Sequence, residues 1–323
     1  MLGAILAFAS AGFFGLNNAT VRRGVLKSTA LHGMAITVPA GIPLFMVFAA
    51  LFGSYAAMAK WPLAAWGWMV GAGIVHFVLG RFGNYRATQA LGATLSTPIQ
   101  QLSILVSLAL ASAFLGESVN LVNGLGILII LLGPAVVMRR RNSAKGLPEG
   151  FVPEYGPGLF WGFICALGYG ASPLMIVLGL GQTRSLADSV GGVLVSYVAA
   201  AVVVAVLIAF SGGRRYMRSL DRGSVGWFAA SAAFVALSQF FRYMALALAP
   251  VSVVVPIQRL SVVFRIIFNA MLNRQHEVLD RGVIAAILMS VLGAIALTAD
   301  TRALLDLLGF GPDAIRVLSR KLY

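Results

Sequence analysis

The chain has 323 residues, of which 59% are hydrophobic and only 11% are charged. A soluble domain carries about 25% charged residues, so this composition excludes an ordinary water-soluble protein and indicates a membrane protein. The formal net charge of +14 is high enough for nucleic-acid binding. However, the basic residues gather between the apolar segments, which is typical of membrane topology, and we expect no nucleic-acid partner.

Apolar segments of about 20 residues follow one another along most of the chain. Such a segment can cross the hydrocarbon core of a bilayer as an α-helix, in which the backbone satisfies its own polar groups. The sequence predicts an all-α integral membrane protein with about ten spans. The predicted spans are 2–21, 30–53, 64–90, 92–115, 120–138, 158–180, 188–211, 225–248, 250–273 and 280–299.

The two halves of the chain repeat each other. The segment TPIQQLSILV, which begins at Thr97, matches VPIQRLSVVF, which begins at Val255, and the same shift places Tyr85 on Tyr243. Five spans in each half make the two copies enter the membrane from opposite faces. The sequence therefore predicts a 5+5 inverted repeat, an architecture of transporters that alternate between two open states.

The repeat predicts four units along the chain. They are a first five-helix repeat in residues 1–144, a linker in 145–157, a second five-helix repeat in 158–299 and an amphipathic C-terminal tail in 300–323. The linker is rich in proline and glycine, and the tail is typical of a segment that lies in the membrane interface. The tail could be a lid, an anchor or a partner-binding helix.

Several motifs recur in both halves. The first half contains YRATQALGATLSTP, then LGE, then ILIILLG, and the second half contains YMALALAPVSVVVP, then HE, then AILMSVLG. On these motifs the chain resembles the EamA-type family of the drug/metabolite transporter superfamily. The resemblance implies a transporter in which the first, third and fourth helices of each repeat surround a central cavity.

Polar side chains line up on the helices that would surround this cavity. Residues three or four apart share a helix face, as Gln100 and Ser103 do on the fourth span. We predict a wet interior, although such residues also join helices by hydrogen bonds. Besides the arginines, the predicted substrate-binding residues are Asn17, Tyr85, Gln100, Ser103, Tyr243, Gln258 and Ser261.

Arginines lie within the predicted spans, where each costs about 2.5–3.5 kcal/mol at a helix centre. No Asp or Glu lies well inside any predicted span to pair with them. Guanidinium groups bind carboxylate and phosphate through two parallel hydrogen bonds. We therefore predict that the arginines hold a substrate anion, the alternative being that they bind helix-end carbonyls. The four are Arg81, Arg242, Arg259 and Arg265.

Several further residues bear on the mechanism. Many EamA-type members carry a Glu just before the proline of the fourth or ninth span, where this chain has Thr97 and Val255. The small multidrug relatives of the family also depend on a membrane-buried Glu in the first helix, where this chain offers Ser10, Asn17 and Asn18 instead. Together these departures disfavour a lipophilic-cation exporter. Pro256, at that proline position in the ninth span, either kinks its helix near the cavity or begins it. His76 lies alone in the third span, and we expect a core hydrogen-bonding role for it rather than proton relay.

The predicted function is secondary transport of a small organic anion that bears a carboxylate or a phosphate. A carrier of a lipid-linked phosphate and a non-transporting membrane scaffold or receptor are the alternatives. The sequence holds no catalytic motif and no Cys/His metal spacing, so we expect no enzyme activity, cofactor or metal. The expected partners are the anion, the lipid bilayer and, as an allowed assembly, a second copy in a homodimer.

The basic loops predict an orientation. Most basic loop residues fall on one side of a ten-span topology, and the positive-inside rule makes that side cytoplasmic. This rule places both termini outside, in a cell membrane of the inner or plasma type. The family resemblance implies termini inside, and we follow the charges.

Overall fold

A computed structural model describes residues 1–117, 120–141, 154–181, 183–272, 301–307 and 309–320, and single positions at 288–289, 292–293 and 296. Most of the predicted linker and of the predicted tenth span therefore lies outside the described residues.

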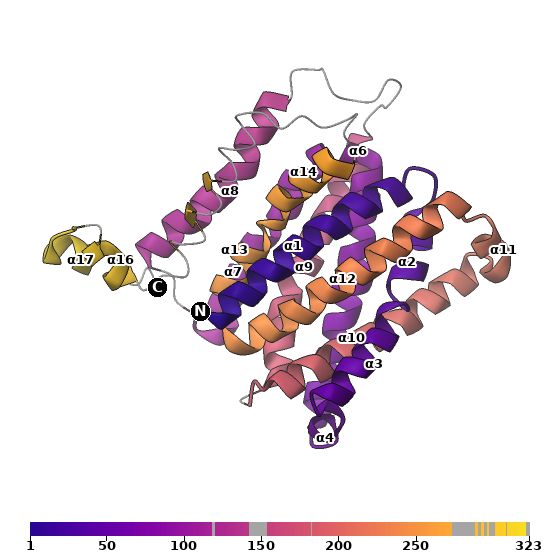
Figure 1. Ribbon diagram of the computed structural model, residues 1–323, viewed down its shortest axis with the longest axis horizontal. Helices are drawn as coiled ribbons and strands as arrows, with labels where there is room; N and C mark the ends of the chain where they lie inside the picture. The colour runs from indigo at the N-terminus through magenta and orange to yellow at the C-terminus, as the bar shows by residue number, and fades with distance from the viewer. Residues whose placement is uncertain are drawn as a thin grey trace.

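Every regular element in the described part of the chain is helical (Figure 1), which confirms the all-α class. The elements are α1 (Leu2–Gly24), α2 (Ala30–Thr37), α3 (Gly41–Leu51), α4 (Ser54–Met58), α5 (Leu63–Gly73), η1 (Ile74–Gly80), α6 (Arg81–Gln101), α7 (Ser103–Leu115), α8 (Leu121–Arg141), α9 (Tyr155–Leu180), α10 (Leu186–Phe210), α11 (Gly213–Arg218), α12 (Arg222–Leu248), α13 (Val251–Gln258), α14 (Ser261–Leu272), α16 (Thr301–Leu307) and α17 (Pro312–Leu318).

Seven stretches of the described chain are long and apolar enough to cross a membrane. They are Leu2–Gly24, Ala30–Leu51, Leu63–Leu91, Tyr155–Leu180, Leu186–Phe210, Arg222–Leu248 and Val251–Asn269, and Ile99–Leu115 is a shorter apolar helix. These eight agree with predicted spans one to four and six to nine. Helix α8 occupies the place of the fifth span.

Two helices begin earlier than predicted, for local reasons. Helix α9 starts at Tyr155 and includes Pro157 in its first turn, where the missing proline N–H costs nothing. Helix α12 starts at Arg222 because the Asp221 side chain caps it, accepting a hydrogen bond of 2.8 Å from the Ser224 N–H. A cap of this kind satisfies a helix-terminal donor that has no partner inside the helix.

The boundary predicted between the third and fourth spans is not an open loop. Helical turns continue through the whole of α6. However, the contacts of α6 with α9 show that the chain reverses its direction within α6, between Leu91 and Ile99. Up to Leu91, α6 runs toward the start of α9, where Leu91 lies against Gly158. From Ile99 the chain runs back along α9, with Ile99 against Gly162 and α7 against Gly170.

Each half of the molecule sends its first helix into the other half. In α1, Gly15 lies against the backbone of Phe264 in α14, and in α9 the equivalent Gly170 lies against Val106 in α7. A Cβ at either glycine would collide with these neighbours. Small residues at such crossings let membrane helices approach closely. The two equivalent crossings are the structural counterpart of the inverted repeat seen in the sequence.

The helices at the repeated PIQ segments are interrupted at matching positions. Helix α6 ends at Gln101 and α7 starts at Ser103, while α13 ends at Gln258 and α14 starts at Ser261. Pro256 lies inside α13, six residues after Pro250, which precedes its first residue. Pro256 therefore does not begin a helix, and the alternative of a broken helix is the one the structure supports.

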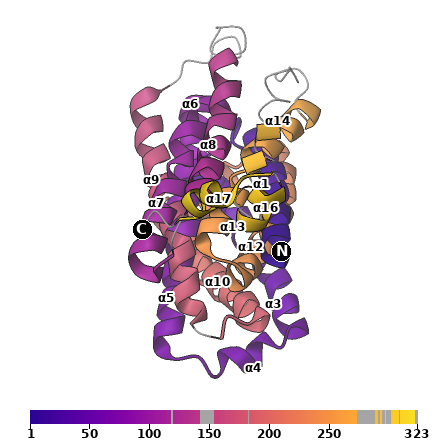
Figure 2. The same cartoon turned by 90° about the vertical axis from the view of Figure 1, so that its left-hand side faces the viewer.

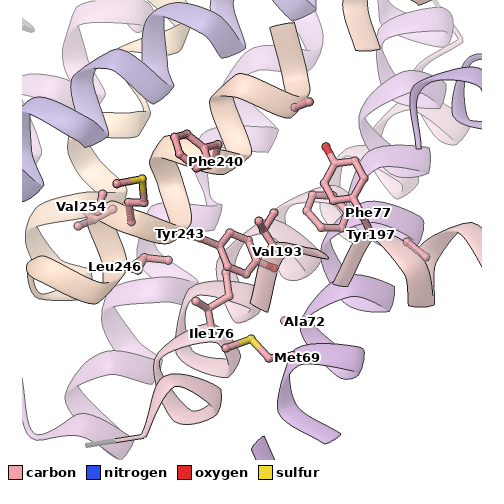
Figure 3. Packing of buried hydrophobic residues seen from close by; sticks show 14 of the residues in the cluster. Met69, Ala72, Phe77, Ile176, Val193, Tyr197, Phe240, Tyr243, Leu246 and Val254 are labelled. Carbon is pink, nitrogen blue, oxygen red and sulfur yellow. The ribbon is translucent and has the colours of Figure 1, made fainter. Parts of the chain in front are cut away.

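A cluster of buried aromatic and aliphatic residues joins the two halves (Figure 3). The rings of Phe77 and Tyr197 pack with their centroids 4.4 Å apart. Tyr243 points into the same cluster, beside Val193, and its hydroxyl donates a hydrogen bond of 2.8 Å to Ser196. This packing holds η1, α10 and α12 together and so fixes the helices that carry the cavity described below.

Helix α8 and the two short C-terminal helices lie outside the main bundle. Figure 1 shows α8 along its edge, with α16 and α17 beyond the lower end of α8, and Figure 2 shows the three in front of the bundle. A hydrogen bond of 2.9 Å from Asn120 to Thr301 joins the start of α8 to α16. Apolar side chains such as Leu307 and Val317 are exposed on these short helices.

Candidate functional site

A small cavity lies where α1, η1, α9 and α12 meet the break between α13 and α14. It has room of about 20 Å³ for the centres of water-sized molecules, which is enough for roughly one water or a small ion. Its lining residues are Ser10, Phe14, His76, Tyr169, Ser238, Gln239, Arg242, Gln258 and Arg259. Both halves contribute, so the cavity lies between the repeats, where inverted-repeat transporters bind their substrates.

Arg242 anchors a polar network on one wall. Its guanidinium donates hydrogen bonds of 2.7 Å to the Ser172 hydroxyl, 3.2 Å to Gln239 Oε1 and 3.0 Å to His76 Nδ1. His76 Nδ1 also lies 2.9 Å from the Ser172 hydroxyl. The imidazole stacks on the ring of Tyr169 at a centroid distance of 4.5 Å. These contacts hold the Arg242 charge in a fixed orientation at the cavity.

Arg259 reaches the cavity from the helix break, and its environment differs from that of Arg242. Its guanidinium carbon lies 5.8 Å from the centroid of the Tyr169 ring. Its Nε is buried and has no hydrogen-bond partner among the described residues. A buried donor without a partner is costly. Arg259 is therefore the charged donor in the cavity whose hydrogen-bonding capacity the described chain leaves unused.

Hydroxyl and amide groups form another part of the wall. The Gln258 amide donates a hydrogen bond of 2.9 Å to the Ser10 hydroxyl. Ser10 and Ser238 bond to each other's backbone carbonyls at 2.8 and 2.9 Å. These contacts join α1 to α12 and place Gln258 one residue before Arg259. The wall offers neutral donors and acceptors beside the arginines.

The lining carries two guanidinium groups and no carboxylate. Two unit charges 4 Å apart interact by about 4 kcal/mol at an effective dielectric constant of 20, which is typical near a protein surface. An anion between Arg242 and Arg259 gains attraction of this order from each of them, and a cation meets equal repulsion. The electrostatics of the cavity therefore favour a negatively charged occupant.

Of the predicted binding residues, Arg242, Arg259 and Gln258 lie in the cavity wall. Arg81 lies outside the lining, where its guanidinium donates to the Tyr197 hydroxyl at 3.2 Å and to Thr37 at 3.4 Å. Its charge also lies 5.0 Å from the centre of the Phe77 ring. The position of Arg81 is thus fixed by contacts inside the core.

The other predicted residues are buried outside the lining. Asn17 accepts a hydrogen bond of 2.6 Å from Ser231, and Ser103 donates one of 2.6 Å to the carbonyl of Gln100. The Tyr85 hydroxyl and the Gln100 amide nitrogen are buried without a partner among the described residues. The residues outside the lining are Asn17, Arg81, Tyr85, Gln100, Ser103, Tyr243, Ser261 and Arg265.

The sequence reasoning missed Tyr169 and Ser172 on α9 and assigned no site role to His76. A signal for α9 was present, because the match of Gly15 with Gly170 also places Phe14 on Tyr169. These two equivalent residues meet edge to face in the cavity wall, with ring centroids 6.0 Å apart. His76 is a hydrogen bonder, as expected, but it is not isolated.

Comparison with known proteins finds one family match, over the first part of the chain. Residues 1–139 match the EamA-like transporter family. This match confirms the resemblance read from the motifs, for the first half of the chain. The protein is a multi-pass membrane protein.

Two kinds of relatives complete the comparison. The chain is 36% identical over 76 residues to magnesium transporter NIPA3 of Pongo abelii and 39% identical over 67 residues to magnesium transporter NIPA4 of Homo sapiens. These matches span 24% and 21% of this chain and only 18% and 17% of those proteins. A crystal structure of another protein superposes with a TM-score of 0.68 at 17% identity, over 92% of this chain and 96% of the other, and so supports the fold.

Proposed function

We propose that the protein is a secondary transporter of a small organic anion that carries a carboxylate or a phosphate. The observation that carries the proposal is the pair Arg242 and Arg259 in a cavity between the repeats whose lining has no acidic residue. Arg242 is held by its network, while Arg259 has a buried donor without a partner. A carboxylate or phosphate oxygen supplies the acceptor that this donor lacks.

The cavity in its present form is too small for a metabolite. Room for roughly one water requires the helices to separate before a larger anion enters. Both repeats interrupt a helix beside this region, and interrupted helices commonly form substrate sites near the midplane. We infer that the structure shows a closed form of an alternating-access cycle. The predicted residues outside the lining, including Gln100, Ser261 and Arg265, would contact the substrate in an open form.

The relatives named for magnesium transport suggest a cation instead. Mg²⁺ prefers six oxygen ligands, usually with one or two carboxylates. The described residues contain no group of three His, Cys, Asp or Glu side chains that could hold a metal ion. Two arginines in the wall also repel a divalent cation. These observations favour the anion, and magnesium is the competing substrate that an experiment must include.

The decisive experiment has two steps. Purified protein is first tested for a rise in melting temperature with inorganic phosphate, pyruvate, succinate and MgCl₂, because a ligand that binds only the folded state stabilises it. Counterflow into proteoliposomes is then measured with each compound. We expect stabilisation and counterflow with at least one anion. Counterflow of magnesium and of no anion would overturn the proposal, and binding without any counterflow would favour a receptor.

We propose a cell membrane location with both termini outside, following the excess of basic residues in the loops on one side. A reporter that is active only in the cytoplasm, fused at Tyr323, should be inactive. A fusion that is active would reverse the orientation. Cross-linking in native membranes would detect the homodimer that we allow for.

A further inference from the structure

His76 lies in the cavity wall and has no part in the anion contacts proposed above. It comes from η1, a π-helical segment between α5 and α6. Such segments are rare and often occur at functional sites. The imidazole is buried, and its neighbours are the stacked ring of Tyr169, the guanidinium of Arg242 and the hydroxyl of Ser172. The only titratable imidazole in this wall thus lies within hydrogen-bond distance of an arginine.

The contacts of His76 indicate its protonation state. One guanidinium nitrogen of Arg242 lies 3.0 Å from Nδ1 and 3.3 Å from Nε2 of the ring, and a guanidinium has five donors and no acceptor for an imidazolium N–H. A neutral imidazole has one accepting nitrogen, and an imidazolium has none. His76 is therefore neutral in this arrangement, with one ring nitrogen available to a proton once the contact with Arg242 loosens.

The arginines around His76 oppose a positive charge on its imidazole as long as the cavity holds no anion. Arg242 and Arg259 face it from α12 and from the break after α13, and Arg81 acts on it from α6. The titratable group that contacts it from α9 is the hydroxyl-bearing ring of Tyr169, and Tyr197 of α10 packs on the neighbouring Phe77. None of these groups is a carboxylate. An anion in the cavity supplies the missing negative charge, and it competes for the donors of Arg242 that now point at the imidazole.

We propose that His76 is the coupling site for a proton that moves together with the anion. The inference rests on the proposed function, since it takes the anion site as given. As the anion binds Arg242 and Arg259, the freed ring nitrogen of His76 takes a proton from hydronium on the open side, and the O–H bond that breaks leaves water. One N–H bond forms on entry and the same bond breaks on release to the other side. A monovalent anion and one proton then cross together without net charge.

The test uses proteoliposomes with the full chain, with pyruvate and inorganic phosphate as the labelled probes. The outside is made one pH unit more acidic than the inside, and the membrane potential is held at zero. With one proton per anion, pyruvate should accumulate up to about tenfold above its level without the gradient. A pH-sensitive dye inside should acidify as pyruvate enters. Liposomes without protein correct for passive entry.

A variant separates coupling from binding. His76→Gln keeps an acceptor for Arg242 and Ser172 but cannot take a proton in this pH range. We expect the accumulation driven by the pH gradient, measured relative to the variant's own pyruvate level at equal pH, to disappear whatever its rate of counterflow. His32→Gln is the matched control: His32 caps α2 through Thr29, glutamine can serve at that capping position, and coupling should persist.

The outcomes are distinguishable. If wild-type protein shows counterflow but neither gradient-driven accumulation nor acidification, the proton site is wrong while the anion transporter stands. Accumulation that persists in His76→Gln also contradicts the inference. If His76→Gln does not fold, the wild-type acidification measurement still decides whether a proton moves. Absence of counterflow with both probes contradicts the proposed function itself and the coupling with it.

Discussion

The two halves of the molecule share a similar arrangement of helices but carry different side chains at equivalent helix breaks. At the helix break of the first half stands Gln101, which is buried and whose amide nitrogen has no partner among the described residues. At the equivalent break of the second half stands Arg259, in the wall of the cavity. The same contrast recurs on the preceding helices, where Asn84 is equivalent to Arg242.

This difference shows which positions serve packing and which serve the cavity. Where the halves agree, as at Gly15 and Gly170, the shared residue is needed for close helix contact. At the two positions named above, the first half has a neutral residue where the second half has an arginine that lines the cavity. A symmetric scaffold thus carries a site whose positive charge comes from one half. Substitutions that make the halves alike test this comparison directly.

The largest effect is expected for Arg259→Gln, which gives the second break the residue of the first. Loss of a charge-assisted contact to the anion costs about 1.5–3 kcal/mol, so transport should fall by about tenfold to 100-fold. Stability should change little, because the guanidinium of Arg259 makes no hydrogen bond to the described residues. Counterflow in proteoliposomes and thermal unfolding in detergent measure the two quantities.

Two companion variants sharpen that result. Arg259→Lys keeps the charge without the forked geometry and should recover transport only in part. Arg214→Gln removes an exposed arginine in α11 and should leave transport unchanged. Normal transport by Arg259→Gln, or outright unfolding, would show that Arg259 is structural.

Much of the fold was predictable because the membrane imposes strong constraints on sequence. Apolar length marked the spans, and the PIQ repeat marked the equivalent helix breaks. The reversal near Leu91 was predicted within a few residues, but the helical hydrogen bonding that continues through it was not. The early starts of α9 and α12 depend on a first-turn proline and a side-chain cap, which hydropathy does not register.

The cavity was predictable only in part. Charge inside a span pointed to Arg242 and Arg259, but the same signal also selected Arg81, whose donors are used by Thr37 and Tyr197. Which arginine faces the cavity depends on the packing of helices distant in sequence. Tyr169 was missed because an aromatic residue in an apolar helix is most often a core residue. Tyr169 lines the cavity because of the residues that pack around it in space.

A second prediction tests the helix crossings that the two halves share. Gly15→Ala and Gly170→Ala should each destabilise the protein by about 1–3 kcal/mol, as overpacked sites do. The added Cβ would lie 2.9 Å from the Arg265 nitrogen in the first case and 2.9 Å from the Ser103 oxygen in the second. Similar losses in thermal unfolding would confirm that the two crossings are equivalent.

The matched control for these variants lies on the same helix as Gly15. Gly12 has open space where a Cβ would stand, and Gly12→Ala should leave stability unchanged or raise it slightly because alanine favours helix. A large loss for Gly12→Ala would mean that any alanine in α1 is harmful. A loss at only one of Gly15 and Gly170 would contradict the equivalence of the crossings.

The smallest effect is expected at a contact that one half makes on the other. The carboxylate of Glu117, at the end of α7, accepts hydrogen bonds of 2.8 and 2.7 Å from the N–H groups of Val251 and Ser252. These donors open α13 and have no partner inside the helix, and the helix dipole favours negative charge there. Glu117→Gln keeps one acceptor but loses the charge, so the free energy of unfolding should fall by about 1 kcal/mol. Thermal unfolding measures the stability of this variant, and Asp306→Asn, which removes an exposed carboxylate, is the control. Equal stability of the two variants would show that the charge of Glu117 does not hold the halves together.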